Sequence, residues 1–392
     1  MLIGIYTEMS FPRGFSSTKR IINYARGLRD AGDQCYVKCV RRTENPDNPI
    51  IIDKSGIFEG IKFDYLPSSP VKAENRLISA LLDLFSVIYC FFYCLIKTPQ
   101  NSVVISYCYS PRYYFAILMA CKFRGIKIFR ELCEYPLPDK TGWIVEIKRF
   151  ITLNVFFKWY SGFLVISHSL KELAEKYGSN KAKIIEVPIL VQPNVSNEKY
   201  VGERPYIFHG GTLLERKDAI VTTIEAFGIA CKELNYSIDF ILAGPKSPHI
   251  DEINKIVNKY NIQQNIKILP PLNYETITKY QNGASLCVLN KHDNLQNRNG
   301  FSTKLGEVLL SETPVVTTYV GEAKYYLKDG ESAYFAYSSS AVDVAKKIVY
   351  AFKHPNISKS IALKGKEIAI NEFNYKKHGL ILSTIFNSIY EK

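Results

Sequence analysis

A chain of 392 residues exceeds the size that one hydrophobic core usually supports, so we expect two domains. Apolar residues make up 47% and charged residues 22% of the sequence, which is typical of a folded globular protein and excludes an intrinsically disordered one. The net charge of +13, whose excess lies mainly in the first half, predicts an anionic partner.

The absence of nucleic-acid-binding motifs narrows the choice of anionic partner. There is no zinc-finger spacing, aromatic RNA-binding motif or long Lys/Arg run, so we expect no nucleic acid and favour an anionic membrane surface. The nine cysteines are scattered without metal-ligand spacing, which indicates reduced thiols and no metal site. The chain begins directly with an apolar strand, with no signal-peptide pattern, and we expect a cytoplasmic protein.

The first half alternates apolar strands with amphipathic helices. A strand at 2–6 is followed by a helix at 16–31, which Gly32 ends, and by a strand at 34–40. Further strands are expected at 102–106, 126–129 and 162–166, and helices at 112–123 and 169–177. A strand followed by a helix, repeated in this way, requires a parallel sheet covered on both faces.

The most apolar run of the chain is Leu84–Ile96. Its 13 residues are fewer than the roughly 20 that span a bilayer. We favour a buried helix. The alternative is a helix that dips into the membrane interface, helped by Lys72, Arg76 and Lys97.

Three loops of the first half follow strands and therefore belong at the ligand-binding edge of the sheet. Gly14 and Phe15 precede the first helix, and Glu131 and Glu134 follow the strand at 126–129. Glu134 is the candidate catalytic residue, able to hold an acceptor hydroxyl or to stabilise positive charge on a reacting carbon. His168 is a weaker candidate for the same cleft. Structural roles for these glutamates and for His168 are equally consistent with the sequence.

The strand and helix pattern restarts after a polar linker at 192–202, which suits a domain hinge. We expect strands at 206–209, 238–242, 266–268, 286–289 and 315–317, and helices at 219–234, 250–260 and 274–282. The domains are therefore placed at 1–195 and 203–375, with a last helix at 376–392 packing back on the first.

The loop after the first strand of the second half combines glycines with cations. Gly210 and Gly211 permit a tight turn and close approach of the backbone to an anion. Arg216 and Lys217 place positive charge where a diphosphate could sit. A plain turn with solvated side chains is the alternative for this loop taken alone.

Two later strands also end in rigid turns. One ends at Gly244, and the next runs into Pro270, Pro271 and Leu272. The prolines could frame a slot in which backbone atoms contact a planar base. A simple strand-terminating turn would look the same.

The segment 299–307 reads as a helix start introduced by a glycine. Asn299, Gly300, Phe301, Ser302, Thr303 and Lys304 lead into a helix that carries Glu307. Backbone N–H groups at a helix start are unpaired and lie at the positive end of its dipole, so they favour phosphate. Glu307 would then accept hydrogen bonds from ribose hydroxyls. An ordinary loop before a helix with a surface glutamate is the alternative.

Together these residues resemble the donor domain of glycosyltransferase family 4, the retaining GT-B enzymes that use nucleotide-sugars. The resemblance rests on Gly210–Leu213 with Lys217, on Gly244-Pro245, on Gly300–Glu307 and on Thr313–Val316 with Gly321-Glu322, and it covers roughly residues 205–372. It implies an α/β protein of two doubly wound Rossmann-like domains that face each other across a cleft. The second of these domains would hold the donor.

The resemblance also implies roles for individual residues. Glu307 is expected on the ribose, the backbone of 300–303 on the diphosphate, and Lys217, with Arg216, as the group that neutralises the diphosphate. Asn299 stands where the family often has a glutamate, and Thr212 where it often has an arginine. Because Asn299 carries no charge, the contacts to the donor sugar are expected to differ from those of relatives.

The function implied is a metal-independent, retaining transfer of a sugar from a nucleotide diphosphate to a hydroxyl. The expected acceptor is a glycan or a lipid-linked saccharide precursor of a cell-surface polysaccharide, reached in the cytoplasm or on the cytoplasmic face of the membrane. Two alternatives remain: a non-catalytic subunit that binds nucleotide or glycan, and a membrane-surface scaffold.

Overall fold

The computed structural model describes residues 1–136, 142–193 and 196–390. The chain divides into two compact units. Unit 1 comprises Met1–Leu190 together with Tyr375–Lys392, and unit 2 comprises Val191–Asn374. The chain therefore passes from one unit to the other twice, at 190/191 and at 374/375. Each unit is built on one sheet.

Unit 1 contains an eight-stranded sheet of order β3-β4-β2-β1-β5-β6-β7-β8, parallel throughout except for the antiparallel pair β3 and β4. Its strands are β1 (Leu2–Thr7), β2 (Gln34–Cys39), β3 (Ser55–Phe58), β4 (Ile61–Tyr65), β5 (Ser102–Tyr107), β6 (Lys127–Leu132), β7 (Gly162–Val165) and β8 (Lys183–Glu186). Its helices are α1 (Ser16–Asp30), α2 (Arg76–Lys97), α3 (Pro111–Arg124), α4 (Trp143–Asn154), α5 (His168–Tyr177) and α15 (Tyr375–Ser388).

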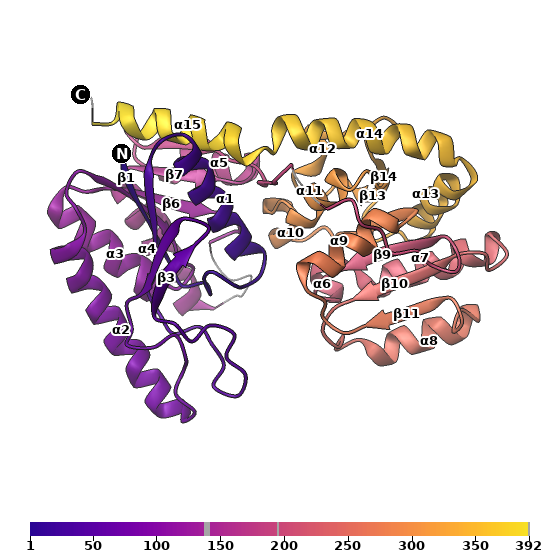
Figure 1. The fold of residues 1–392 in the computed structure, drawn as a ribbon, viewed down its shortest axis with the longest axis horizontal. Helices are drawn as coiled ribbons and strands as arrows, with labels where there is room; N and C mark the ends of the chain where they lie inside the picture. The colour runs from indigo at the N-terminus through magenta and orange to yellow at the C-terminus, as the bar shows by residue number, and fades with distance from the viewer. Residues whose placement is uncertain (137–141, 194–195, 391–392) are drawn as a thin grey trace. The chain divides into compact units, whose positions relative to one another are not determined.

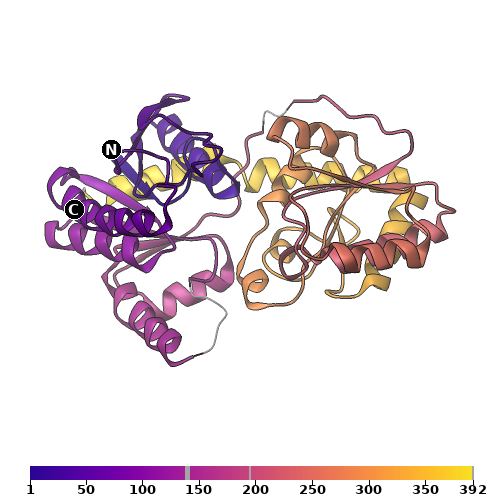
Figure 2. The same cartoon turned by 90° about the horizontal axis from the view of Figure 1, so that it is seen from below.

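The two faces of this sheet are covered by different helices. On one face, α1 and α15 pack side by side, as both views show (Figures 1 and 2). Their contact is close, since a Cβ on Gly27 or Gly379 would overlap the facing backbone. Phe386 of α15 reaches the sheet and packs on Phe129, with 4.9 Å between ring centroids. On the other face α2 packs on α3, and Tyr6 shares a hydrogen bond of 2.7 Å with Thr98, which follows α2.

Helix α2 differs from the expectation of a buried helix at 84–96. Its inner stripe is made of the small buried residues Ser86, Cys90 and Cys94, whereas its large apolar residues point outward. We call six of them, each 47–78% exposed, the outer face of α2: Leu77, Leu81, Leu84, Phe85, Ile88 and Phe92. The helix is long and apolar enough to cross a membrane by length and composition, yet only 17% of its most apolar window is buried.

Unit 2 contains a six-stranded parallel sheet of order β11-β10-β9-β12-β13-β14. Its strands are β9 (Tyr206–Gly210), β10 (Asp239–Ala243), β11 (Ile266–Leu269), β12 (Leu286–Leu289), β13 (Val315–Thr318) and β14 (Tyr334–Ala336). Its helices are α6 (Glu215–Asp218), α7 (Ile220–Glu233), α8 (Ile250–Tyr260), α9 (Tyr274–Gly283), α10 (Leu295–Asn299), α11 (Thr303–Leu310), α12 (Ala323–Tyr326), α13 (Ala341–Lys353) and α14 (Pro355–Glu372). The core of one face joins the strands to α7, α8 and α13.

Both sheets reverse their strand order once. In unit 1 the order turns at the neighbours β1 and β5, and in unit 2 at β9 and β12. In open α/β sheets, ligands bind beyond the carboxyl ends of the strands at such a switch point. The α/β class with parallel sheets, predicted from the sequence, is confirmed, and the topology directs attention to two places.

Candidate functional site

The first place is the switch point of unit 2, where the loops after β9 and β12 meet. His209 joins the two strands, because its Nδ1 donates a hydrogen bond of 2.9 Å to the carbonyl oxygen of Val288. The loop from Gly210 to Asp218 leaves β9, and Lys291 follows β12. Lys304, at the start of α11, reaches the same place, since its Nζ lies where a Cβ on Gly211 would be.

Asp218 is the centre of this cluster, and two lysines converge on it. Lys291 Nζ lies 3.1 Å from Oδ1, and Lys304 Nζ lies 3.1 Å from Oδ2. Thr212 donates a hydrogen bond of 2.6 Å to Oδ2. Asp218 is 2% exposed. A buried carboxylate held by two ammonium groups and a hydroxyl leaves the cluster with a net positive charge, fixed in position.

The electrostatics of the cluster follow from burial and from the neighbouring charges. Burial would raise the pKa of Asp218, but Lys304 and Lys291 outweigh it and hold that pKa far below its usual range. Burial, aided by Lys291 and Lys217 against the pull of Asp218, lowers the pKa of Lys304 to about 8. Burial and then the charge of Lys304 lower the pKa of His209 to about 4, so this imidazole is neutral at neutral pH.

The glycines of the predicted donor site are required by close packing. A Cβ on Gly244 would overlap the carbonyl oxygen of Gly211, whose N–H donates a 2.8 Å hydrogen bond to the carbonyl of Ala243. The loops after β9 and β10 therefore touch through backbone alone.

A hollow of about 280 Å³ opens beside these loops, at the ends of β10 and β11. Gly244, Pro270 and Pro271 line it together with apolar side chains such as Leu213 and Ile268. Leu272 is not among the lining residues. The structure thus brings together the two predicted turns around one hollow, and its role toward a base remains a prediction.

The segment 299–307 contains two short helices and the turn between them. Gly300, Phe301 and Ser302 connect α10 to α11, and the Ser302 side chain does not cap the first N–H groups of α11. The Phe301 side chain is buried and stacks on Tyr326, with 5.4 Å between ring centroids. Any contact of Phe301 with a donor would therefore come from its backbone.

Asn299 and Glu307 differ in how far the fold uses them. Asn299 is 6% exposed, and its amide donates a 2.8 Å hydrogen bond to the carbonyl of Leu295 within α10. Glu307 is half-buried on α11, one turn beyond Thr303. The Asn299 amide thus bonds within its own helix. We had expected it to contact the donor sugar, and this internal bond was not predicted.

Arg216 and Lys217 lie on α6 and contribute to the cluster in part through their backbone. The carbonyl oxygen of Lys217 accepts a 3.0 Å hydrogen bond from Lys291 Nζ. The carbonyl of Arg216 accepts one of 2.9 Å from the Asn294 amide. The Lys217 charge is close enough to lower the pKa of Lys304, although burial and Lys291 contribute more.

In unit 1, Gly14 and Phe15 line a hollow at the ends of β1 and β2. Glu131 does not join them. Its carboxylate is 3% exposed, pairs with Arg20 at 2.7 Å and accepts a 2.8 Å hydrogen bond from Tyr24. Burial raises the pKa of Glu131 despite Arg20. The placement of Glu131 at the cleft is corrected: an apolar core has taken up both partners of this ion pair.

Glu134 and His168 lie at the expected strand ends. Glu134 is half-buried two residues beyond β6, and it adds to the effect of burial and Cys133 in raising the pKa of Tyr109. His168 begins α5, and its Nε2 lies 3.8 Å from a Glu186 carboxylate oxygen. Their predicted roles toward an acceptor remain predictions.

Sequence reasoning did not single out Asp218, Lys291 and His209. Each follows or lies beside a strand end, which is the signal that could have found them. Within residues 1–136, 142–193 and 196–390, His, Cys, Asp and Glu side chains form no group of three or more that could hold a metal ion.

Comparison with known proteins agrees with this geometry. Residues 194–368 match the family described as glycosyl transferases group 1. A trehalose synthase of Pyrococcus horikoshii is 32% identical over 92 residues, and this match spans 24% of the chain and only 22% of the relative.

Solved structures match over the whole chain at lower identity. Sucrose-phosphate synthase from Thermosynechococcus elongatus has a TM-score of 0.72 at 13% identity, covering 100% of this chain and 99% of that one. The Anabaena protein HepE, in complex with UDP and glucose, has a TM-score of 0.71 at 13% identity, covering 98% and 99%. The second half of the chain, residues 194–368, therefore resembles the glycosyl transferases group 1 family, and the chain as a whole has the GT-B glycosyltransferase fold.

Proposed function

We propose that the chain is a nucleotide-sugar-dependent glycosyltransferase that transfers a sugar with retention at the anomeric carbon. The observation that carries the proposal is the convergence of Lys291 and Lys304 on Asp218 at the switch point of unit 2, with 3.1 Å in each ion pair. Two cations on one internal carboxylate leave positive charge for a diphosphate. The relative HepE, which was solved with UDP, makes a uridine nucleotide the first donor to test.

The proposed chemistry uses this charge on the leaving group. The bond from the anomeric carbon to the diphosphate breaks, and a bond from that carbon to the acceptor oxygen forms on the same face. The acceptor proton passes to the departing diphosphate oxygen. Lys304, Lys217 and the first N–H groups of α11 stabilise the charge that builds on the diphosphate. Glu307 holds the ribose, and Gly244, Pro270 and Pro271 enclose the base.

The same cations make a divalent metal unnecessary in this proposal. Lys291 and Lys304 are held by Asp218 before any ligand arrives, so the site is already ordered. We expect transfer to continue in the presence of a chelator, and loss of activity with EDTA that magnesium or manganese restores would contradict this.

The acceptor is proposed to be a glycan or a lipid-linked saccharide precursor of a cell-surface polysaccharide. The net charge of +13 and the outer face of α2 support work at the cytoplasmic face of a membrane. These two features concern the location of the enzyme and leave the transferred sugar open.

The test is release of nucleoside diphosphate from a panel of nucleotide-sugars, with and without acceptor lipid extract. Release by the native chain and its loss in Lys304→Met support the proposal. The matched control is Lys255→Met, an exposed lysine on α8. Tight binding of a nucleotide-sugar without any release would instead support a non-catalytic binding subunit. That alternative is favoured by Asn299 and Thr212, whose side chains are bonded within the fold.

A further inference from the structure

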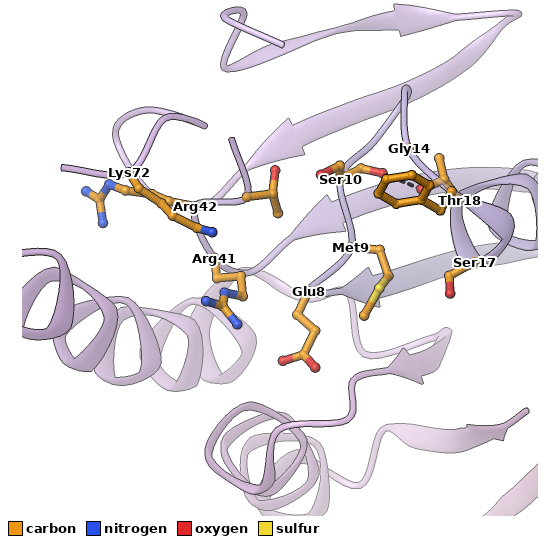
Figure 3. Close-up of a pocket in the computed structure, with 11 residues that line it drawn as sticks. Glu8, Met9, Ser10, Gly14, Ser17, Thr18, Arg41, Arg42 and Lys72 are labelled. Atoms are coloured by element: carbon orange, nitrogen blue, oxygen red, sulfur yellow. Dashed lines mark hydrogen bonds between the residues drawn. The ribbon is translucent and has the colours of Figure 1, made fainter. Parts of the chain in front are cut away.

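The second place, beside the switch point of unit 1, is a hollow of about 260 Å³ beyond the ends of β1 and β2. Its charged lining consists of three cations and one carboxylate. Figure 3 shows Arg41, Arg42 and Lys72 gathered at one end, Gly14, Ser17 and Thr18 at the other, and Glu8 between them. The hollow lies wholly within unit 1, in residues 8–72.

Arg42 is buried in the wall of this hollow without an anionic partner. It is 7% exposed. Its guanidinium donates only long hydrogen bonds to neutral oxygens, at 3.3 Å to Ser68 and to Ser86 and at 3.5 Å to the carbonyl of Leu82. In the described part of the chain no carboxylate pairs with it. A buried charge without a counter-ion is costly, so the free protein holds Arg42 ready for an anion.

Arg130 shows that a buried arginine is not by itself an anion site. It is 2% exposed, but its guanidinium lies over the Tyr114 ring at 4.1 Å and the Phe157 ring at 5.2 Å. Aromatic faces can compensate a buried cation. Arg42 differs because one side of it opens on the hollow.

Two further cations and a helix start strengthen the anion site. Lys72 makes no ion pair among the residues described, and Arg41 pairs only at 3.4 Å with Asp83. The N-cap of α1 is Phe15, which has no acceptor side chain, and no acidic residue lies in the first turn. The backbone N–H groups of Thr18 and Lys19 donate to the carbonyl oxygen of Phe15. Among the described residues, the N–H groups of Ser16 and Ser17 at the start of this 15-residue helix are therefore the ones open to a ligand.

Glu8 is the anionic group at the side of the hollow. Its Oε1 accepts hydrogen bonds of 2.9 and 3.0 Å from the backbone N–H groups of Tyr109 and Ser110. These bonds anchor the carboxylate across the β1 and β5 switch point. With Glu8 and Asp83 counted against Arg41, Arg42 and Lys72, the cations are still in excess.

The hollow is directly connected to helix α2. Arg41 contacts Asp83, and Arg42 contacts Leu82 and Ser86, all of which are on α2. The other side of the same helix is the outer face of α2. One helix therefore has an anion site against its inner side and a row of large apolar side chains on its outer side, with Lys72 and Arg76 near its first turn.

We propose that the acceptor is a lipid whose phosphate group binds Arg42, Lys72 and the start of α1, while its hydrocarbon chain remains in the membrane on which α2 lies. The proposal rests on the transferase function above and names its acceptor class. A lipid phosphate combines the two chemistries that α2 brings together, an anion and an apolar chain. At ~1.5 Å per residue, the 22 residues of α2 lie about 33 Å along the bilayer surface.

The test is sedimentation of the full-length protein with vesicles. One set is phosphatidylcholine with a small fraction of polyprenyl phosphate, and the other carries phosphatidylglycerol to the same total negative charge. We expect about tenfold tighter binding to the first set. Arg42→Met and Lys72→Ala should each abolish this preference, and Lys62→Ala, an exposed lysine on β4, should keep it. Phe85→Ser should weaken binding to both sets.

Other outcomes separate this inference from the proposed function. Equal binding to the two vesicle sets, or a preference that survives both Arg42→Met and Lys72→Ala, would overturn the lipid-phosphate site. Nucleoside diphosphate release is measured in parallel on the same preparations. Release without a vesicle preference sinks the acceptor inference alone, whereas a preference with no release from any nucleotide-sugar sinks the transferase and, with it, the reading of the lipid as an acceptor.

Discussion

The two units hold the cations near their switch points in opposite ways. In unit 2, Lys291 and Lys304 share the internal carboxylate of Asp218. In unit 1, Arg42 is bonded only to neutral oxygens. A cation with an internal counter-ion is ordered at little cost and can assist each reaction cycle, whereas an unpaired buried cation gains most when its ligand arrives. The paired lysines of unit 2 suit a diphosphate that binds and is released in each reaction cycle. The unpaired Arg42 of unit 1 suits a phosphate group that must be bound tightly.

The largest effect is expected for Asp218→Asn. This change would leave the lysines of unit 2 without a counter-ion, as Arg42 is in unit 1. Two half-buried lysines would then lie beside each other without their anion. We expect a loss of about 3–5 kcal/mol in the free energy of unfolding of unit 2. Thermal or urea unfolding checks this, with the exposed Asp251→Asn on α8 as the control. A melting curve like that of the native chain would show that Asp218 does not hold the lysines together.

Removing one lysine should affect catalysis more than folding. Lys304→Met leaves Asp218 paired with Lys291. We expect kcat for transfer to fall about 100-fold, as when one preorganised donor to a developing charge is removed. Steady-state kinetics with saturating donor give the answer. A large rise in KM with unchanged kcat would indicate that Lys304 only binds the ground state.

Among the described residues Lys217 forms no ion pair with Asp218, unlike Lys291 and Lys304. For Lys217→Ala we expect turnover to fall at least about tenfold, equivalent to ~1.4 kcal/mol on the barrier. Near-normal rates would remove Lys217 from the phosphate site and leave Lys304 and Lys291 as its cations. The double variant with Lys304→Met distinguishes shared from independent roles, because residues on one phosphate give non-additive losses.

Donor binding should depend on pH through Lys304. Its pKa in the folded protein, about 8, lies below the ordinary lysine value, so it is charged below pH 8 and loses its proton as pH rises through that value. Because the charged form attracts the diphosphate, UDP affinity should weaken above pH 8. Calorimetry across this range should show the weakening disappear in Lys304→Met and move to higher pH in Lys304→Arg. A flat native profile would contradict the assignment.

The smallest effect is expected for Arg42→Met in the absence of ligand. Removing an unpaired buried charge relieves a desolvation cost while losing three long hydrogen bonds, so stability should change by less than about 1 kcal/mol. Thermal unfolding in buffer without phosphate measures this. A loss as large as that of Asp218→Asn would show that Arg42 has a structural partner and would end the contrast between the units.

Strand positions and their order in the chain were accessible from the sequence, because continuous apolar runs such as 102–106 and 286–289 have few alternatives to buried strands. The glycine loops at strand ends were accessible for the same reason. The hairpin of β3 and β4 was missed, since its strands are short and mixed in polarity.

Three features could not be read from local pattern. Lys291 and Asp218 are 73 residues apart and meet only because β9 and β12 are neighbours. Glu131 and Arg20 are separated by 111 residues, and nothing near Glu131 marks it as buried. For α2, apolar residues surround the helix, so their periodicity does not predict which side packs on the rest of unit 1. The side that packs is the one with the small residues Ser86, Cys90 and Cys94.

The packing of α15 on unit 1 has a consequence for folding during synthesis. Its Leu382 and Phe386 belong to the same core cluster as β1 and α1. During synthesis these residues leave the ribosome after all of unit 2. While Val191–Asn374 is being translated, the apolar face of unit 1 beside α1 is therefore uncovered. We expect chaperones to bind the nascent chain most strongly during that interval.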